Sequence, residues 1–296
     1  MGIIKLRAVW YALSGLLFTG SFFSLAVYGL NFGIDFTGGS LLALRFEERP
    51  ATLEIERMLQ PYDTGKVIIQ PVGDTDVNIR SKSLNEETHQ NIISAFQDQY
   101  PNVTELRFDS IGPSVGAELR SKSLWALAIS FGLILVYIAY AYRKVSVPVQ
   151  NWKYGVITLI TALHDVVIPL GVFSLLGKFA GVEVGTPFVV AVLTVLGYSI
   201  NDTIVVFDRI RENLHRLSGR FEEIVGASLT QTYVRSLNTS LTTLFAIVAV
   251  YLFGGESLRN FALTFIIGVI AGTYSSIFIS SPLLVTWQKL SSRNGK

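Results

Sequence analysis

The chain has 296 residues, of which 50% are hydrophobic and 16% charged, and its mean hydropathy is +0.46. Soluble domains carry about 25% charged residues, so this composition indicates a membrane protein. The sequence contains no cysteine, which excludes structural disulfides and cysteine-ligated metals. Its three histidines lie far apart and form no metal-binding motif.

Six apolar segments reach or approach the ~20 residues that a helix needs to cross a bilayer. They are roughly Ala8–Leu30, Leu124–Tyr142, Tyr154–Leu176, Pro187–Phe207, Leu237–Phe253 and Phe261–Trp287. The fifth is expected to begin earlier, near Thr232, so that it includes Arg235. The first follows a basic lead, but it is longer than the apolar core of a signal peptide and is expected to stay in the protein.

The acidic residues indicate one water-soluble insert, because 14 of the 22 lie between Asn31 and Ser123. We therefore predict three parts: 1–30 with the first span, an external domain at 31–123, and five spans in 124–296 with a cytoplasmic loop at about 208–231. Short basic loops mark the cytoplasmic side of a membrane. Basic residues gather at both termini and in the loops after the second and fourth spans, so both termini are expected in the cytoplasm. The residues concerned are Lys5, Arg7, Arg143, Lys144, Lys153, Arg209, Arg211, Arg216, Arg220, Lys289, Arg293 and Lys296.

The insert alternates strand-like and helix-like segments. Ser40–Phe46 has the composition of a strand, and Ala51–Gln60 has helical spacing of its apolar residues. Two short strands joined by a Gly-Asp turn follow, then a helix within Ser83–Tyr100 and a closing strand that ends at Ile111. This β-α-β-β-α-β order predicts a ferredoxin-like α+β domain with a four-stranded antiparallel sheet and both helices on one face. An irregular loop is the alternative, which the amphipathic periods disfavour.

A glycine-rich motif, "GIDFTGG" at 33–39, stands between the first span and the insert. It is not a Walker phosphate-binding loop, because it lacks the lysine, and Asp35 would repel a phosphate. Gly33 is expected to end the first span in a left-handed conformation. Gly38 and Gly39 are expected to allow a tight turn or a close backbone approach. These assignments leave Asp35 unexplained.

Three ionisable residues fall within the predicted spans. Asp165 lies in the middle of the third, Asp202 near the cytoplasmic side of the fourth, and Arg235 about one turn into the fifth. Charges inside membranes are costly and usually face a bundle interior or a water path. The similar depth of Asp202 and Arg235 predicts an ion pair that protonation of the acid would release. We interpret all three as a proton relay.

Each of these residues has a simpler interpretation. Asp165 could have a purely structural role, as an acceptor of hydrogen bonds from a neighbouring span. Arg235 could serve as an anchor whose side chain extends to the lipid headgroups. His164 could either pack between helices or carry protons. Gly268, Gly272, Ser276 and Ser280 recur every four residues, and such small residues let helices approach closely. They could pack within the chain or against a partner.

Four motifs resemble the SecD/SecF family of bacterial protein-export subunits, and their order and spacing match its SecF branch. They are "GIDFTGG" at 33–39, "ALHDVVIPLG" at 162–171, "GYSINDTIVVFDRIREN" at 197–213 and "GTYSSIFISSPLL" at 272–284. The resemblance implies a six-helix transmembrane bundle of the RND superfamily that pairs with SecD and associates with the SecYEG channel. It also implies that proton entry helps to pull exported polypeptides outward. Gly33, Asp35, Gly38 and Gly39 would then form a hinge to the external domain.

The resemblance also implies the surroundings of the chain. We expect a bacterial inner membrane, or a thylakoid membrane in a photosynthetic source, and a YidC-type insertase among the partners. No enzyme activity, metal or nucleic acid is expected, and the proton is the only coupling ion. The alternative function is one half of an RND-type proton-driven exporter of small molecules or lipids. Such exporters usually have twelve spans and larger external domains.

Overall fold

A computed structural model of the chain describes residues 2–142 and 149–293. The chain divides into a helical unit, Met1–Asn31 with Trp125–Lys296, and a sheet unit, Phe32–Leu124. This boundary agrees closely with the one predicted for the external domain. Arg143, Lys144 and Lys296, which contribute to the predicted orientation, lie outside the described residues.

The helical unit contains six stretches that are long and apolar enough to cross a membrane, as predicted. A short helix, α1 (Gly2–Lys5), precedes them. The first five are α2 (Arg7–Tyr28), α6 (Pro113–Ala141), α7 (Asn151–Ala180), α8 (Thr186–Arg216) and α9 (Phe221–Phe253). The sixth consists of α10 (Glu256–Ser275), a π-helical segment η1 (Ser276–Ser280) and α11 (Ser281–Arg293).

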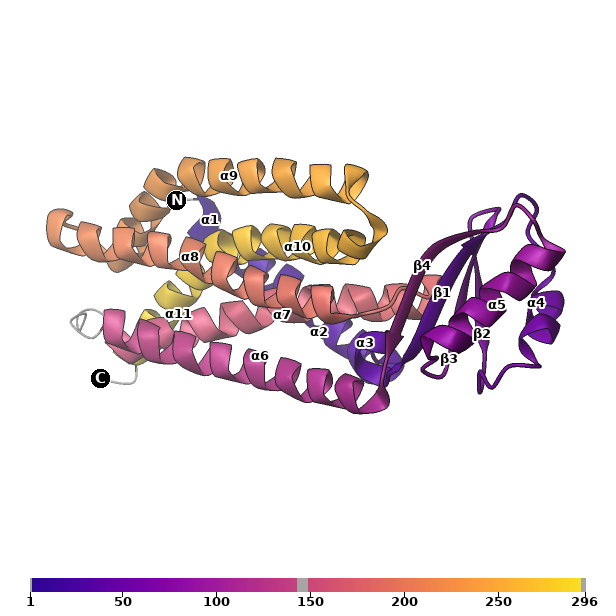
Figure 1. Ribbon diagram of the computed structural model, residues 1–296. Helices are drawn as coiled ribbons and strands as arrows, with labels where there is room; N and C mark the ends of the chain where they lie inside the picture. The colour runs from indigo at the N-terminus through magenta and orange to yellow at the C-terminus, as the bar shows by residue number, and fades with distance from the viewer. Residues whose placement is uncertain (1, 143–148, 294–296) are drawn as a thin grey trace. The chain divides into compact units, whose positions relative to one another are not determined.

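Three of the six stretches form the centre of the helical unit (Figure 1). In their most apolar windows, 61% of α7, 50% of α8 and 61% of the sixth stretch are buried. The corresponding shares are 11% for α2, 6% for α6 and 17% for α9. Both predicted membrane acids, Asp165 and Asp202, belong to central helices. The outer helices present apolar surface that lipid or a partner could cover.

Helices extend into the predicted cytoplasmic loop at 208–231. Only residues 217–220 lie between α8 and α9. Charged pairs one turn apart support the extension, since Glu212 forms ion pairs with Arg209 and Arg216. At the start of α9, the backbone N–H of Arg220 donates a hydrogen bond to the side chain of Glu223. Apolar composition alone therefore underestimates the length of these helices.

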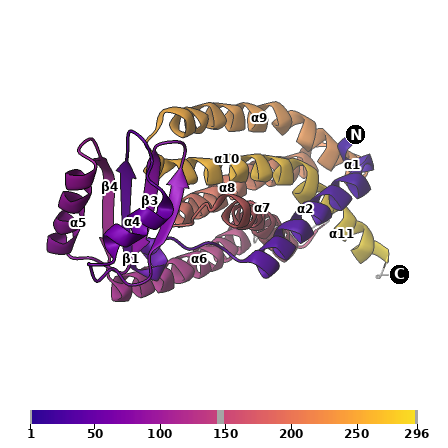
Figure 2. The same cartoon turned by 90° about the vertical axis from the view of Figure 1, so that its right-hand side faces the viewer.

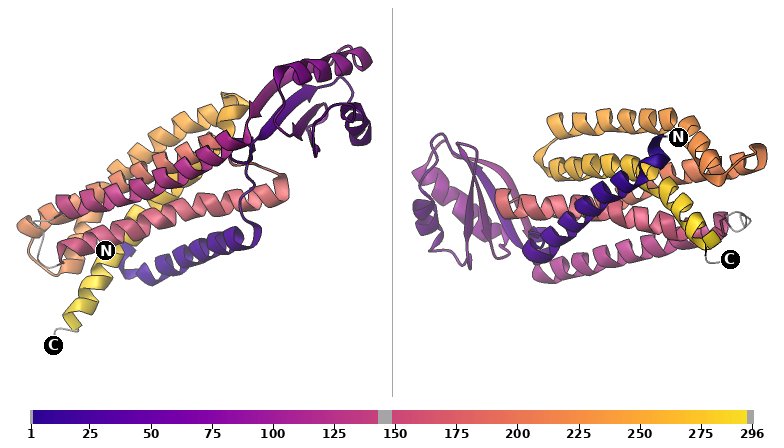
Figure 3. Two further views of the ribbon diagram at one scale, coloured as in Figure 1. Left: turned by 60° about the horizontal axis from the view of Figure 1, so that its bottom comes forward. Right: turned by 180° about the vertical axis from the view of Figure 1, so that it is seen from behind.

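The sixth stretch changes direction between α10 and α11 (Figures 2 and 3). Pro282 has no N–H to donate to the carbonyl of Phe278, and its ring crowds that carbonyl. The π-helical segment η1 lies immediately before this proline. Such segments are wide, irregular turns that are frequent at functional sites. The sequence prediction of one continuous helix missed this break.

The sheet unit has the predicted ferredoxin-like order. Its strands are β1 (Gly39–Arg45), β2 (Ile68–Val72), β3 (Asp76–Ser81) and β4 (Thr104–Ile111), arranged β2-β3-β1-β4 with every neighbouring pair antiparallel. The helices α4 (Thr52–Leu59) and α5 (Glu86–Gln99) contribute to one apolar core with β1 and β3. They cover the same face of the sheet (Figure 1). Asn85 caps α5 by accepting a hydrogen bond from the N–H of Thr88.

Phe96, on α5, is 1% exposed and packs against Phe46 with ring centroids 6.1 Å apart. We expect Phe96→Ala to destabilise the sheet unit by about 3–5 kcal/mol, because it leaves a cavity in a small core. Urea-dependent proteolysis of the full-length protein measures this loss. Gln97→Ala, at the exposed neighbouring position, is the control and should change stability little. Equal loss in both variants would contradict the assigned core.

The glycine-rich motif differs in one respect from the prediction. Helix α2 ends at Gly29, which has the positive φ (67°), whereas Gly33 is extended (φ −73°) and precedes a short helix, α3 (Ile34–Thr37). The prediction that Gly33 ends the first span was therefore wrong. Gly38 and Gly39 do have positive φ values, 71° and 120°. A Cβ at Gly38 would lie 2.8 Å from the Cα of Pro113 at the start of α6, so the expected close backbone approach is confirmed.

Candidate functional site

Asp165 lies at the middle of α7 and is fully buried. One of its carboxylate oxygens is 2.8 Å from Nδ1 of His164. The other accepts hydrogen bonds from the hydroxyls of Ser199, on α8, and Ser275, on α10; the Ser275 oxygen is 2.6 Å away. These groups replace the water that a carboxylate loses on burial. Asp165 thus joins the three central helices through polar contacts.

Asp202 lies three residues after Ser199, on the same side of α8, and is 5% exposed. Its carboxylate is 3.4 Å from the hydroxyl of Ser276. That hydroxyl lies closer, at 2.6 Å, to the carbonyl oxygen of Gly272. Because a serine has only one proton to donate, Ser276 cannot fully satisfy both the carbonyl of Gly272 and the carboxylate of Asp202.

Two consecutive serines each contact one of the two acids. Ser275, the last residue of α10, contacts Asp165, and Ser276, the first residue of η1, contacts Asp202. Both serine side chains are fully buried. The two acids therefore contact adjacent residues of the sixth stretch at the centre of the helical unit, each through a separate hydroxyl. These contacts lie at the point where the sixth stretch changes from α- to π-helical geometry.

Helix α7 is also irregular at this level. Pro169 lies inside α7 and lacks the N–H that would bond to the carbonyl of Asp165, four residues earlier. The backbone oxygen of Asp165 therefore lacks its usual helical donor. Local breaks in regular hydrogen bonding thus occur in two of the three central helices, beside the same acid.

The structure does not bring Arg235 into an ion pair with Asp202. Arg235 is exposed on α9 and forms no ion pair with any residue that the structure describes. The adjacent Ser236 is 1% exposed and lies on the side of α9 that faces Asp202. The prediction compared only positions along the helices, whereas residues 235 and 236 point in directions about 100° apart.

His164 was given two interpretations, and its surroundings contain features of both. Its ring stacks between Phe18 of α2 and Tyr274 of α10, with centroids 6.4 Å from each. Its Nδ1 contacts Asp165, and its buried Nε2 has no hydrogen-bond partner among the described residues. Sequence analysis did not select Ser199 or Ser275. The i, i+3 spacing of Ser199 and Asp202 was the signal that could have identified the first.

The row of small residues in the sixth stretch packs within the chain. A Cβ at Gly272 would lie 2.8 Å from the Cβ of Ser199, and Gly268 packs against Val195, also on α8. Ser276, predicted only as a packing residue, also contacts Asp202. These glycines bring α10 close enough to α8 for the serines to reach both acids.

Gly272→Val is therefore expected to force α10 and α8 apart. Overpacking of a tight contact costs about 1–3 kcal/mol. Thermal unfolding of the purified protein in detergent should show a lower melting temperature. Gly132→Val on α6 is the matched control, because a Cβ there meets no atom within 4 Å. An unchanged melting temperature for Gly272→Val would show that the contact is not tight.

Comparisons with known proteins identify the family. Residues 91–290 match the family model described as "Protein export membrane protein SecD/SecF, C-terminal", and residues 23–48 match the "SecD/SecF GG Motif". The protein translocase subunit SecF of Thermobaculum terrenum is 41% identical over 97% of this chain and 93% of the relative. The SecF subunit of Desulfurispirillum indicum is 40% identical over 96% and 91%. The chain belongs to the SecF family.

Family membership makes the chain a multi-pass membrane subunit of the Sec protein translocase, and thus a transport protein rather than an enzyme. Two solved SecDF structures also match, each at 34% identity and over 39% of its own chain. A translocon-associated SecDF from Thermus thermophilus matches 98% of this chain with a TM-score of 0.84. A SecDF in a "super-membrane-facing form" matches the whole chain with a TM-score of 0.66.

Proposed function

We propose that this SecF-family subunit, together with SecD, uses proton movement through the Asp165–Asp202 site to promote protein export. One observation carries the proposal: two buried acids on neighbouring helices each contact one of two consecutive serines at a π-helical break. Buried ionisable groups in a membrane protein commonly mark proton or ion paths. The rest of the chemistry then depends on which acid exchanges a proton.

Asp202 is the exchanging acid in this proposal. The hydroxyl of Ser276, 3.4 Å from its carboxylate, already has a closer acceptor in the carbonyl of Gly272. A protonated Asp202 would supply the missing donor by giving its own O–H to the Ser276 oxygen. The separation of Arg235 from Asp202 in this structure then fits the state in which Asp202 is protonated. After proton release, Arg235 would become the counter-charge of the ionised acid.

The π-helical segment is the element that we expect to move. Ser276 is the first residue of η1, and Ser275 immediately precedes it. A change of helical register there would therefore alter the contacts of both serines with Asp165 and Asp202 at once. The joint at Gly33, Asp35, Gly38 and Gly39 would pass this movement to the external domain. Support comes from the positive φ of Gly38 and Gly39.

The proposed surroundings follow the prediction from the sequence. Both termini would lie in the cytoplasm and residues 31–123 outside, in a bacterial inner membrane. SecD would cover part of the outer apolar surface, and the assembly would act on exported polypeptides at the SecYEG channel. A YidC-type insertase is a further expected partner. The low burial of α2, α6 and α9 within this chain supports the need for a partner.

The proposed function is tested by export of a secreted reporter in membranes that contain SecD, with and without this chain. Each is measured with the proton gradient intact and with the gradient collapsed by a protonophore. The chain should raise export only while the gradient is present. An equal increase after the gradient has collapsed would contradict proton coupling.

A further inference from the structure

The start of α7 contains a buried lysine that forms no ion pair with any residue that the structure describes. Lys153 is 7% exposed, and its ammonium donates a hydrogen bond to the hydroxyl of Ser291 on α11 at 2.6 Å. An ammonium has three donors. Within residues 2–142 and 149–293, Lys153 forms no ion pair and no second side-chain hydrogen bond. A buried charge normally needs an opposite charge, so this arrangement is incomplete.

Two tryptophans flank the ammonium. The Nζ of Lys153 lies 5.9 Å from the ring centroid of Trp152 and 5.9 Å from that of Trp287. The two indoles meet edge to face, with centroids 5.2 Å apart. Aromatic faces attract a cation but accept none of its conventional hydrogen bonds. Tryptophan side chains of this kind are enriched where membrane helices meet the headgroup layer.

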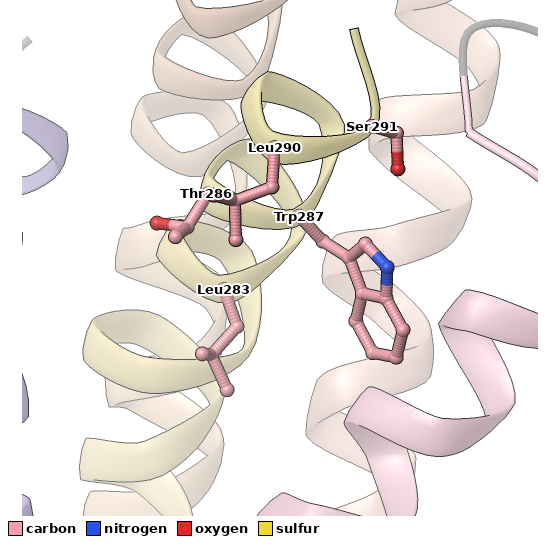
Figure 4. A pocket seen from close by; sticks show the side chains of 5 residues that line it. All are labelled: Leu283, Thr286, Trp287, Leu290 and Ser291. Atoms are coloured by element: carbon pink, nitrogen blue, oxygen red, sulfur yellow. The ribbon is translucent and has the colours of Figure 1, made fainter. Parts of the chain in front are cut away.

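A hollow of about 260 Å³ lies along α11 beside this group (Figure 4). One face of the helix lines it, through Leu283, Thr286, Trp287, Leu290 and Ser291. Trp287 and Ser291 belong both to the hollow and to the surroundings of Lys153. From Leu283 to Ser291 the helix rises about 12 Å, from an apolar end to a polar end at Ser291, whose hydroxyl accepts from Lys153. The hollow therefore suits a molecule with an apolar chain and an anionic head.

We propose that this hollow binds an anionic phospholipid. The phosphate would accept hydrogen bonds from Lys153, and an acyl chain would lie over Leu283 and Leu290. Lys289, also on α11, already forms an ion pair with Glu222, so we assign the selectivity for charge to Lys153. Because the site joins α7 to α11, the bound lipid would also hold the segment that follows η1. This inference is independent of proton coupling.

Native mass spectrometry of the purified full chain tests the site, with phosphatidylglycerol and phosphatidylcholine of the same acyl chains as probes. The wild type should retain phosphatidylglycerol in preference to phosphatidylcholine. Lys153→Met should weaken that binding about fivefold, since one basic residue near a membrane surface contributes about that factor. Lys153→Arg should keep it. Lys178→Met, at an exposed position near the other end of α7, is the matched control and should also keep it.

A second measurement does not depend on the folding of Lys153→Met. Phosphatidylglycerol brominated on its acyl chains should quench the tryptophan fluorescence of the wild type, and Trp287→Phe should remove part of that quenching. Equal retention of both lipids, or no effect of Lys153→Met, would overturn the proposal and indicate nonspecific lipid contact. Displacement of phosphatidylglycerol by inorganic phosphate would also overturn it, because the site would then bind a free anion.

Discussion

Asp202→Asn is expected to reduce proton-dependent export to the level of membranes that lack the chain. Asparagine has the shape of aspartate and can still contact Ser276, but it cannot bind and release a proton at this position. The variant should assemble with SecD and keep most of its thermal stability, because the side chain keeps its size and shape. Reporter export with and without a proton gradient measures the effect.

Asp208→Asn is the matched control for this substitution. Asp208 lies on the same helix, six residues further on, with a largely exposed side chain paired with Arg211. It should leave gradient-dependent export unchanged. Wild-type export by Asp202→Asn would make Asp202 a structural group, and the proton path would have to run through Asp165 or through the partner.

Asp165→Asn is expected to lose most gradient-dependent export and, unlike Asp202→Asn, to destabilise the helical unit. The carboxylate of Asp165 contacts His164, Ser199 and Ser275. An amide cannot accept from all three groups, and leaving buried polar atoms unsatisfied costs about 1–3 kcal/mol. Thermal unfolding in detergent and reporter export, measured on the same preparation, separate the two effects.

Thr161→Val provides the control for a general disturbance of α7. Thr161 is 1% exposed, lies one turn before Asp165, and bonds to the carbonyl of Ile157 in its own helix. This variant should keep export nearly intact. If it lost as much export as Asp165→Asn, the effect would belong to the packing of α7 rather than to the carboxylate.

Much of the fold could be predicted from local sequence patterns. The apolar stretches located all six candidate spans, and the insert indicated by the change in charge density nearly coincides with the sheet unit, Phe32–Leu124. The periods of apolar residues predicted the order of strands and helices in that domain. These features depend on residues close together in the sequence. The short helix α3 was missed because one helical turn has no detectable period.

The site was less predictable because its contacts join distant parts of the chain. The sequence identified Asp165 and Asp202 as buried acids, but their connection depends on Ser275 and Ser276, more than 70 residues further on. Pro282 was visible in the sequence, yet its position alone does not show that the preceding turn becomes π-helical. The pairing of Arg235 with Asp202 was predicted only from their positions along the two helices. The orientation of α9 about its axis instead turns Ser236, rather than Arg235, toward Asp202.

The central claim is that protons move through this subunit by way of Asp202. The most direct test is proton flux in proteoliposomes that contain the chain and SecD, followed with a trapped pH-sensitive dye after a pH gradient is imposed. The wild-type complex should pass protons, and Asp208→Asn should behave like it. Asp202→Asn should reduce the flux to that of protein-free vesicles. A wild-type flux in Asp202→Asn would contradict the claim.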